Sequence, residues 1–477
     1  MGRLNIPGLT LRNWIAILLI SAALVIPCFW QSRIQSADLS SHIYNAWLAT
    51  RIHQGTAPGL WISPQSNNIL FDVILEWLLV RVGPSWAQRI AVSFSVLVFG
   101  WGAASFVFRA AGRNWWVVAP SIAMLAYGFI FHMGFFNFYL SMGFCLGYLG
   151  IVWGKSWRVH ATATPLLVVA FVAHPLPATW ALATAVYGLL AARVKPPHRR
   201  LLLLPGFAAI LTARLILTQR YAFAWSIHQL TFISGATQLA LFGLKYTLPV
   251  AGILLIWASL LHKLIKRQGL ATLVSSISFQ LWLLNAAAVV LIPDAILFPH
   301  FGRPLSFIAQ RLSLGAGLMM IATVAQVFPT RPAKVALVSL TLLFFGFLFA
   351  DERQLNHRED QLDAALHSIP PSQRVIASLT DQSLRSLCFH HALDRACIGR
   401  CFSYANYEPS SLQFRIRAQL GNSIVLDNRV DVDAVSNGTY KVQSRDLPLY
   451  LVYPCGQDSG EVCTRPLKAG ESLRDPL

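Results

Sequence analysis

The chain contains 477 residues, 55% of them hydrophobic and only 12% charged, and its mean hydropathy is +0.53. These values exclude an ordinary soluble globular protein. The formal net charge is +18, but residues 1–350 contain only four acidic residues and no nucleic-acid-binding motif is found. The positive charge therefore indicates membrane topology and attraction to anionic lipid head groups, with no nucleic-acid partner.

Apolar runs recur along residues 1–350 and define the fold class. Several reach the roughly 20 residues that cross about 30 Å of hydrocarbon as a helix. The runs are 14–30, 88–108, 115–131, 134–153, 161–173, 178–192, 201–217, 237–261, 270–292, 304–328 and 333–350. We therefore predict an α-helical polytopic membrane protein with about eleven transmembrane helices. The stretch 69–82 is also apolar, but it is short and carries Asp72, Glu76 and Arg81, which favours a helix lying in the membrane interface.

Basic residues predict the orientation of these spans. If the N-terminus is cytoplasmic, alternating spans place every dense basic loop on the cytoplasmic side. The opposite side then receives 32–87, 132–133, 174–177, 218–236, 293–303 and everything after 350. A full span at 69–82 would move each later loop to the other side of the membrane, and the basic loops would then no longer all be cytoplasmic. The first apolar run has no small-residue cleavage site after it, so we expect an uncleaved signal-anchor and a multi-pass protein of the cell inner membrane.

The first predicted outer loop, 32–87, holds three of the four acidic residues of the membrane part, and Asp38 is the first of them. An ionisable acid beside a membrane is costly to keep and suggests a functional site. Apolar residues recur at helical spacing over 38–52, which predicts an amphipathic helix. Asp38, His42 and Asn45 follow one another at i, i+4 and i+7, so they share one face of that helix.

Residues 351–477 are predicted to form a separate domain on the extracytoplasmic side. The segment opens with a charged helical stretch, Asp351–Leu366, which two prolines end. Short β-like runs with turn residues between them follow at 373–379, 423–427, 429–435, 439–443 and 448–453. We therefore expect a small α/β or mostly β domain, attached to a membrane domain of residues 1–350.

Five of the seven cysteines lie in this tail, at Cys388, Cys397, Cys401, Cys455 and Cys463. Disulfides belong to oxidising compartments and stabilise small domains most. We expect two disulfides and one free thiol, with the connectivity open. Zinc binding is the alternative, because His390 and His391 lie near Cys397 and Cys401, but the spacing fits no standard zinc pattern.

The order of elements near the N-terminus carries a family resemblance. A first span precedes an outer loop that opens with Asp38 on an amphipathic helix; a second short apolar helix follows, and then a glycine and the start of the next span at Ala87, Arg89 and Ile90. In this order the chain resembles the integral-membrane glycosyltransferases of the GT-C superfamily, such as the aminoarabinose and protein mannosyl transferases. The resemblance covers about residues 10–110 and is architectural over the rest of the membrane part. The tail matches only in position.

The resemblance implies a sugar donor carried on a polyprenyl phosphate and a lipid, glycan or protein acceptor at the outer membrane face, with Asp38 as general base or acceptor-orienting group. Attack at the anomeric carbon releases a proton that a base must take. The leaving phosphate needs cationic or hydrogen-bonding partners. No cofactor is implied. A divalent cation is less favoured than in many members of the family, because Leu39 follows Asp38 and the 132–133 turn has no acid.

The site candidates divide by role. His42 would share a proton with Asp38 or contact the donor. For the donor phosphate, Arg303 in the last outer loop is the first choice, since arginine suits bidentate phosphate contact. His300, Arg220 and Lys245 are the further phosphate candidates, and Asn45, His132, Asn137, His174, Asp72 and Glu76 are predicted to line the cavity. Structural roles compete with these, since Asp38 would also cap its helix and Arg303 would also extend to lipid phosphate.

Two other function classes remain open. In a multi-span transporter or lipid flippase, Asp38 would belong to a substrate path. That class favours internal repeats and acids within spans; the charges inside spans here are mainly Arg214 and Arg311, and no repeat is evident. A non-catalytic envelope assembly protein is the other class, but it does not explain two amphipathic surface helices with clustered acids.

Overall fold

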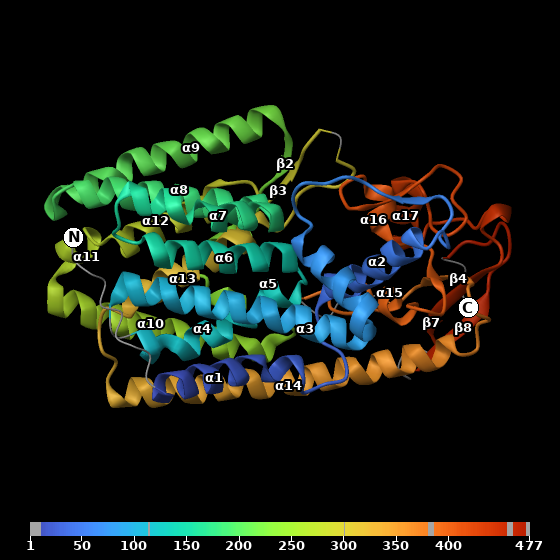
Figure 1. The fold of residues 1–477 in the computed structure, drawn as a ribbon, viewed down its shortest axis with the longest axis horizontal. Helices are drawn as coiled ribbons and strands as arrows, with labels where there is room; N and C mark the ends of the chain where they lie inside the picture. The colour runs from blue at the N-terminus through green and yellow to red at the C-terminus, as the bar shows by residue number, and fades with distance from the viewer. Residues whose placement is uncertain (1–10, 113–114, 300, 380–385, 456–460, 474–477) are drawn as a thin grey trace.

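The computed structural model describes residues 11–112, 115–299, 301–379, 386–455 and 461–473. Within them, a bundle of nearly aligned helices carries the tail at one end, and α2 lies beside the tail elements (Figure 1). The α-helices are α1 Leu11–Val25, α2 Ala37–His53, α3 Leu70–Ala111, α4 Ala119–Ala126, α5 Phe129–His132, α6 Phe136–Val152, α7 Trp157–Ala173, α8 Pro175–Arg193, α9 Leu203–Arg220, α10 Thr247–Gln268, α11 Leu270–Val274, α12 Ile277–Leu291, α13 Ile308–Val324, α14 Arg331–Leu366, α15 Ala392–Ala396, α16 Tyr407–Ser411 and α17 Arg429–Ser436. The 3₁₀ helices are η1 Ile26–Cys28, η2 Trp115–Val118, η3 Pro196–Leu202, η4 Ile227–Phe232, η5 Ala236–Leu239, η6 Leu244–Tyr246 and η7 Ser444–Asp446.

Apolar helices dominate the part of the chain before the tail. Five segments in the described residues are long and apolar enough to cross a membrane: Leu70–Ala111, Pro175–Arg193, Pro196–Arg220, Leu244–Gln268 and Arg331–Leu366. Shorter apolar helices occupy Asn13–Cys28, Trp116–His132, Phe136–Val152, Trp157–Ala173, Ile277–Leu291 and Ile308–Val324. Each predicted apolar run overlaps one of these segments. The prediction of a helical membrane protein agrees with this architecture, whereas eleven crossings remain a prediction.

The predicted break between the interface helix and the next span is present within α3. Gly83 has φ 75° and ψ 168°, which is not helical, and Pro84 follows it. Glycine adopts this positive φ without steric penalty, so the sequence places the kink there. Before the kink, Trp77 and Val80 are exposed apolar side chains, and the guanidinium of Arg81 lies 4.0 Å from the Trp77 ring centroid. Such a surface suits the interface between lipid and water.

The tail contains a four-stranded mixed sheet in the order β5-β4-β7-β8. Its strands are β4 Arg374–Ala377, β5 Phe402–Ser403, β7 Leu449–Pro454 and β8 Val462–Pro466, with β4 parallel to β5 and β7, and β8 antiparallel to β7. The predicted strand 373–379 contains β4, and the predicted strand 448–453 covers all of β7 except Pro454. The strand predicted at 429–435 is wrong, because Asn428 caps a helix there by accepting a hydrogen bond from the Asp431 amide.

The other two predicted strands are wrong as well: 423–427 contains no strand, and 439–443 forms only an isolated bridge from Lys441 to Ser472.

The tail packs directly on the first outer loop. Strand β1, Leu60–Ile62, pairs antiparallel with β6, Ile416–Ala418, and α15 packs against α2. A second two-stranded sheet joins β2, Ala222–Ala224, to β3, Ala295–Leu297. Helix α14 continues from the bundle into the tail without a break at residue 350, as its long course in Figure 1 shows. The separate domain at 351–477 therefore stays a prediction, while its close packing on α2 is a feature of the fold.

The cysteines of the tail follow the prediction of two disulfides and one free thiol. Cys397 is bonded to Cys401 and Cys455 to Cys463, while Cys388 is buried and free. Cys397 and Cys401, the two cysteines considered as zinc ligands, are thus bonded to each other.

Candidate functional site

A cavity of about 640 Å³ lies where the first outer loop, the ends of several bundle helices and the tail meet. Five residues predicted for the site line it, although they come from distant parts of the sequence: Asp38, His42, Asn137, His174 and Arg303. Aromatic side chains, among them Phe135, Phe138 and Phe307, supply much of the remaining wall. The cavity therefore combines an apolar surface with a few convergent polar groups, as small-molecule sites do.

The start of α2 places Asp38 at the cavity wall. The Asp38 amide donates to the Met133 carbonyl oxygen at 3.2 Å, which ties the helix to the turn before α6. Gly134 in that turn has φ 79°, and a Cβ atom there would lie 2.4 Å from the Asp38 nitrogen, so only glycine permits the approach. Ser36 is the N-cap residue, so Asp38 lies inside the first turn. Its carboxylate is favoured there by the helix dipole and is about a quarter exposed.

His42 lies one turn further along α2 and is held by a second acid. Its Nδ1 lies 2.5 Å from an Asp72 carboxylate oxygen, and Asn137 donates to the other Asp72 oxygen at 2.8 Å. Burial alone would lower the pKa of His42, but Asp72, with contributions from Glu408 and Asp38, outweighs burial and raises the pKa to about 9. His42 is thus positively charged at neutral pH, which favours contact with a donor phosphate over acceptance of a proton.

The charge on His42 predicts how stability depends on pH. A histidine whose pKa is raised on folding contributes stability that is fully present below its unfolded pKa of about 6.5. That contribution is lost as the pH rises through about 9. Burial also raises the pKa of Glu408, to about 8, which adds to the loss at high pH. Thermal unfolding of the purified protein at pH 6, 7.5 and 9 should show a falling midpoint. The His42→Gln variant should show a weaker fall, and an equal fall in both proteins would contradict the assignment.

Arg303 and Arg311 both line the cavity but differ in their partners. Arg303 donates to an Asp433 carboxylate at 2.9 Å and lies 5.0 Å from the Tyr407 ring centroid, so its charge is already balanced. Arg311, the fourth residue of α13, is only 8% exposed, and its Nε and Nη1 are buried without a hydrogen-bond partner among the described residues. A buried guanidinium that lacks a partner is costly and suits an incoming anion.

Three predicted residues, Asp72, Asn45 and Glu76, do not line the cavity. Asp72 reaches the cavity only through His42 and Asn137. Asn45 accepts a hydrogen bond from Asn406 at 2.8 Å and donates to Ser41, so it joins α2 to the tail. Glu76 is paired with Arg415 at 2.9 Å. These three side chains therefore connect the elements that surround the cavity.

Three further predicted residues, His132, Lys245 and Arg220, are also absent from the cavity lining. His132 is fully buried, and its Nδ1 lies 2.9 Å from the Gln35 carbonyl oxygen. Lys245 is paired with Asp351 at 2.6 Å. Arg220 ends α9 and is exposed. The structure therefore gives Lys245 and Arg220 no contact with the cavity, and His300 lies outside the described residues.

Sequence reasoning missed three basic residues of the cavity, Arg311, His390 and His391. Arg311 was noticeable as a charge within an apolar run, a position that by itself suggests function. His390 and His391 drew attention only as neighbours of cysteines, yet both line the cavity. In the described residues, no group of three or more His, Cys, Asp or Glu side chains is arranged to hold a metal ion. Independence from metal remains a prediction.

Comparison with known proteins gives no relative: no family model, no curated protein and no solved structure matches the chain. The functional inference therefore depends on the residues of the cavity.

Proposed function

We propose that this protein is a membrane glycosyltransferase of the GT-C type. It would move a sugar from a polyprenyl-phosphate donor to an acceptor at the extracytoplasmic face of the inner membrane. The observation that carries the proposal is the shared cavity of Asp38 and Arg311, an acid and a buried unpaired cation lining one space. The disulfides of the tail support an oxidising, extracytoplasmic side for this end of the molecule.

The two groups suit the two ends of the reaction. The acceptor hydroxyl attacks the anomeric carbon, and its proton passes to the Asp38 carboxylate. The bond from that carbon to the phosphate oxygen breaks, and the phosphate leaves with the electron pair. Arg311 and the charged His42 then stabilise the added negative charge, because both side chains are buried and cations in low-dielectric surroundings act more strongly than in solution. The phenylalanine-rich wall offers an apolar surface for the lipid part of the donor.

An assay of sugar release tests the proposal. The wild type and Asp38→Asn, reconstituted in membranes, are incubated with a panel of polyprenyl-phosphate sugars and a membrane extract that supplies acceptors. The wild type should release sugar from at least one donor, and Asp38→Asn should be about 100-fold slower, the usual contribution of a general base. Asp360→Asn is the matched control, since Asp360 is 60% exposed on α14 and does not line the cavity.

Equal release by wild type and Asp38→Asn would remove Asp38 from the mechanism. Movement of intact donor across the membrane, with no sugar released, would instead favour the transporter or flippase class.

A further inference from the structure

A histidine of the tail lies between the proposed base, Asp38, and a second, buried acid. His391 Nε2 is 3.6 Å from an Asp38 carboxylate oxygen, and His391 Nδ1 is 3.3 Å from Asp394 Oδ2. The other Asp394 oxygen, Oδ1, accepts a hydrogen bond from the Ser403 hydroxyl at 2.5 Å. Asp38 comes from α2, and the other three residues come from the tail. The tail therefore contributes His391 to the cavity wall beside Asp38.

Burial gives this arrangement a defined orientation. Asp394 is only 4% exposed, its Oδ2 accepts no hydrogen bond within the described residues, and His391 Nδ1 lies 3.3 Å from this oxygen. The ring packs on Tyr407, with centroids 5.0 Å apart. A buried carboxylate favours a donor against it. A small rotation of the ring would place Nδ1–H on Oδ2, so Asp394 favours the Nδ1–H tautomer, which leaves Nε2, 3.6 Å from Asp38, free to accept a proton.

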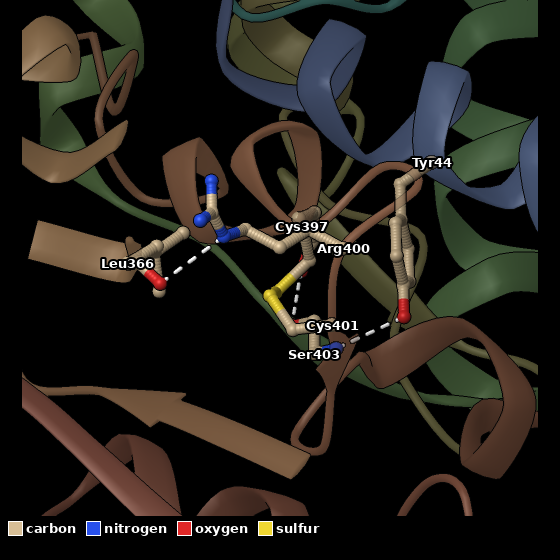
Figure 2. The surroundings of a disulfide bond; sticks show 7 residues. Tyr44, Leu366, Cys397, Arg400, Cys401 and Ser403 are labelled. Atoms are coloured by element: carbon tan, nitrogen blue, oxygen red, sulfur yellow. Dashed lines mark hydrogen bonds between the residues drawn. A yellow bond between two sulfur atoms is a disulfide. The ribbon is translucent and has the colours of Figure 1, made fainter. Parts of the chain in front are cut away.

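The backbone around Ser403 is fixed to the same helix that carries Asp38. The Ser403 amide donates to the Tyr44 hydroxyl at 2.9 Å, and Tyr44 lies on α2 (Figure 2). The Cys397–Cys401 disulfide connects the end of α15 to the residue before β5, next to Ser403. The tail thus contacts α2 at two points, at Asp38 and at Tyr44. These contacts hold Asp38, His391 and Asp394 in fixed relative positions.

We propose that His391, oriented by Asp394, receives the proton that Asp38 takes from the acceptor. The inference rests on the proposed glycosyl transfer and adds the tail to its chemistry. In the step, the O–H bond of the acceptor breaks and its proton moves to Asp38; the proton then forms an N–H bond at His391 Nε2, and Asp38 returns to the carboxylate. The Nδ1–H stays with Asp394. Distances of this kind are often longer before substrate binds.

The groups around His391 fit a proton acceptor. Asp38 and Asp394 face it with negative charge, and Tyr407 and His390 pack on the ring. Once His391 carries the proton, its charge together with burial opposes protonation of His390, whose pKa is lowered to about 4, so His390 does not compete for the proton. Glu408 and Arg303 lie beyond Tyr407.

Turnover of His391→Ala is the first test. We expect kcat to fall about 100-fold with KM nearly unchanged, because the ring acts on the proton and not on the donor. Added imidazole should restore at least a tenth of the lost rate, which a purely structural histidine would not show. His357→Ala, an exposed histidine on α14, is the matched control and should keep full activity with no response to imidazole.

Asp394→Asn tests the orientation without removing the ring or changing its volume. The Ser403 hydroxyl would keep donating to the Asn oxygen, so the amide NH₂ would face His391 Nδ1. A donor at that place favours an unprotonated Nδ1 and moves the ring hydrogen to Nε2, where it blocks proton transfer. ¹⁵N-histidine NMR of the full chain in lipid nanodiscs, assigned with His391→Gln, should show the Nδ1–H tautomer in the wild type and the Nε2–H tautomer in the variant.

The outcomes separate this inference from the function on which it rests. Sugar transfer that persists in His391→Ala and Asp394→Asn overturns the relay and leaves glycosyl transfer standing. An identical tautomer in wild type and Asp394→Asn also overturns it. If the tautomer differs between wild type and Asp394→Asn but the wild type releases sugar from no donor, the proposed function is overturned. The coupling of His391 to Asp394 is then still supported.

Discussion

Replacement of Arg311 by methionine is expected to abolish most sugar transfer and, at the same time, to make the protein slightly more stable. The loss of activity follows from the position of Arg311 in the cavity wall, where its free donors would meet the leaving phosphate. Removal of a single preorganised donor of this kind lowers kcat by about 100- to 1,000-fold. The measurement is the initial rate of sugar release at saturating donor.

The gain in stability follows from the missing partners. A buried polar group without a hydrogen bond costs about 1–3 kcal/mol, and more when it is charged. The guanidinium recovers part of this cost from Phe135, whose ring centroid lies 4.2 Å from Cζ, an interaction that stabilises by about 2 kcal/mol when desolvated. Methionine fills a similar volume with no polar atom. The thermal midpoint in detergent should therefore rise by a few degrees.

Arg214 offers a matched control for this experiment. It also lies within an apolar helix, but its Nη1 donates to the Leu291 carbonyl oxygen at 2.7 Å, and it does not line the cavity. Arg214→Met should keep sugar transfer and lower the midpoint slightly, because it breaks a hydrogen bond. A destabilised Arg311→Met with normal transfer would show that Arg311 is a structural residue whose partners are already sufficient.

The contrast between these arginines shows how much the sequence could predict. Helical spacing placed Asp38 and His42 on one face, and both line the cavity because that relation depends on only four residues of chain. Arg303 was correctly placed at the cavity by its loop. Its partner Asp433 lies 130 residues further along the chain, so no local pattern could predict that the charge of Arg303 is balanced.

Lys245 shows the same dependence on tertiary packing. It was selected as an unpaired charge near the end of a span, but Asp351 of α14 lies 2.6 Å from it. The pairing depends on α10 and α14 packing side by side, and no local pattern encodes that contact. Likewise His391 reaches Asp38 only because the tail folds back onto α2. Periodicity fixes faces of helices, whereas the partner of each polar side chain is fixed by tertiary packing.

Removal of Glu359 is expected to give the largest loss of stability. Glu359 and Arg395 form a buried ion pair between α14 and α15, and they are 2% and 9% exposed. Gln35 donates to Glu359 at 3.0 Å, and Arg395 donates to the Ile34 carbonyl oxygen at 2.9 Å and to Gln88 at 3.2 Å. The pair thus joins the tail to the first outer loop and to α3. Glu359→Ala leaves the guanidinium buried without its carboxylate, which costs about 3–5 kcal/mol.

Thermal unfolding and hydrogen exchange measure this effect. The midpoint of Glu359→Ala should fall, and amides of α15 should exchange faster, because the variant loosens that helix first. Asp360→Ala changes the neighbouring residue on the same helix, but Asp360 is 60% exposed, so its pair with Arg33 contributes at most about 1 kcal/mol. A midpoint equal to that of Asp360→Ala would contradict the role of the buried pair.

The double variant Glu359→Leu with Arg395→Met separates charge from packing. Replacing both partners of a buried pair by apolar residues is often neutral, since neither charge remains to be solvated. We therefore expect the double variant to recover most of the midpoint that Glu359→Ala loses. Arg395 follows Asp394 directly on α15, so the same pair fixes the acid that orients His391. Sugar transfer should accordingly fall in Glu359→Ala and return in the double variant, because the position of Asp394 depends on how firmly α15 is held against the loop.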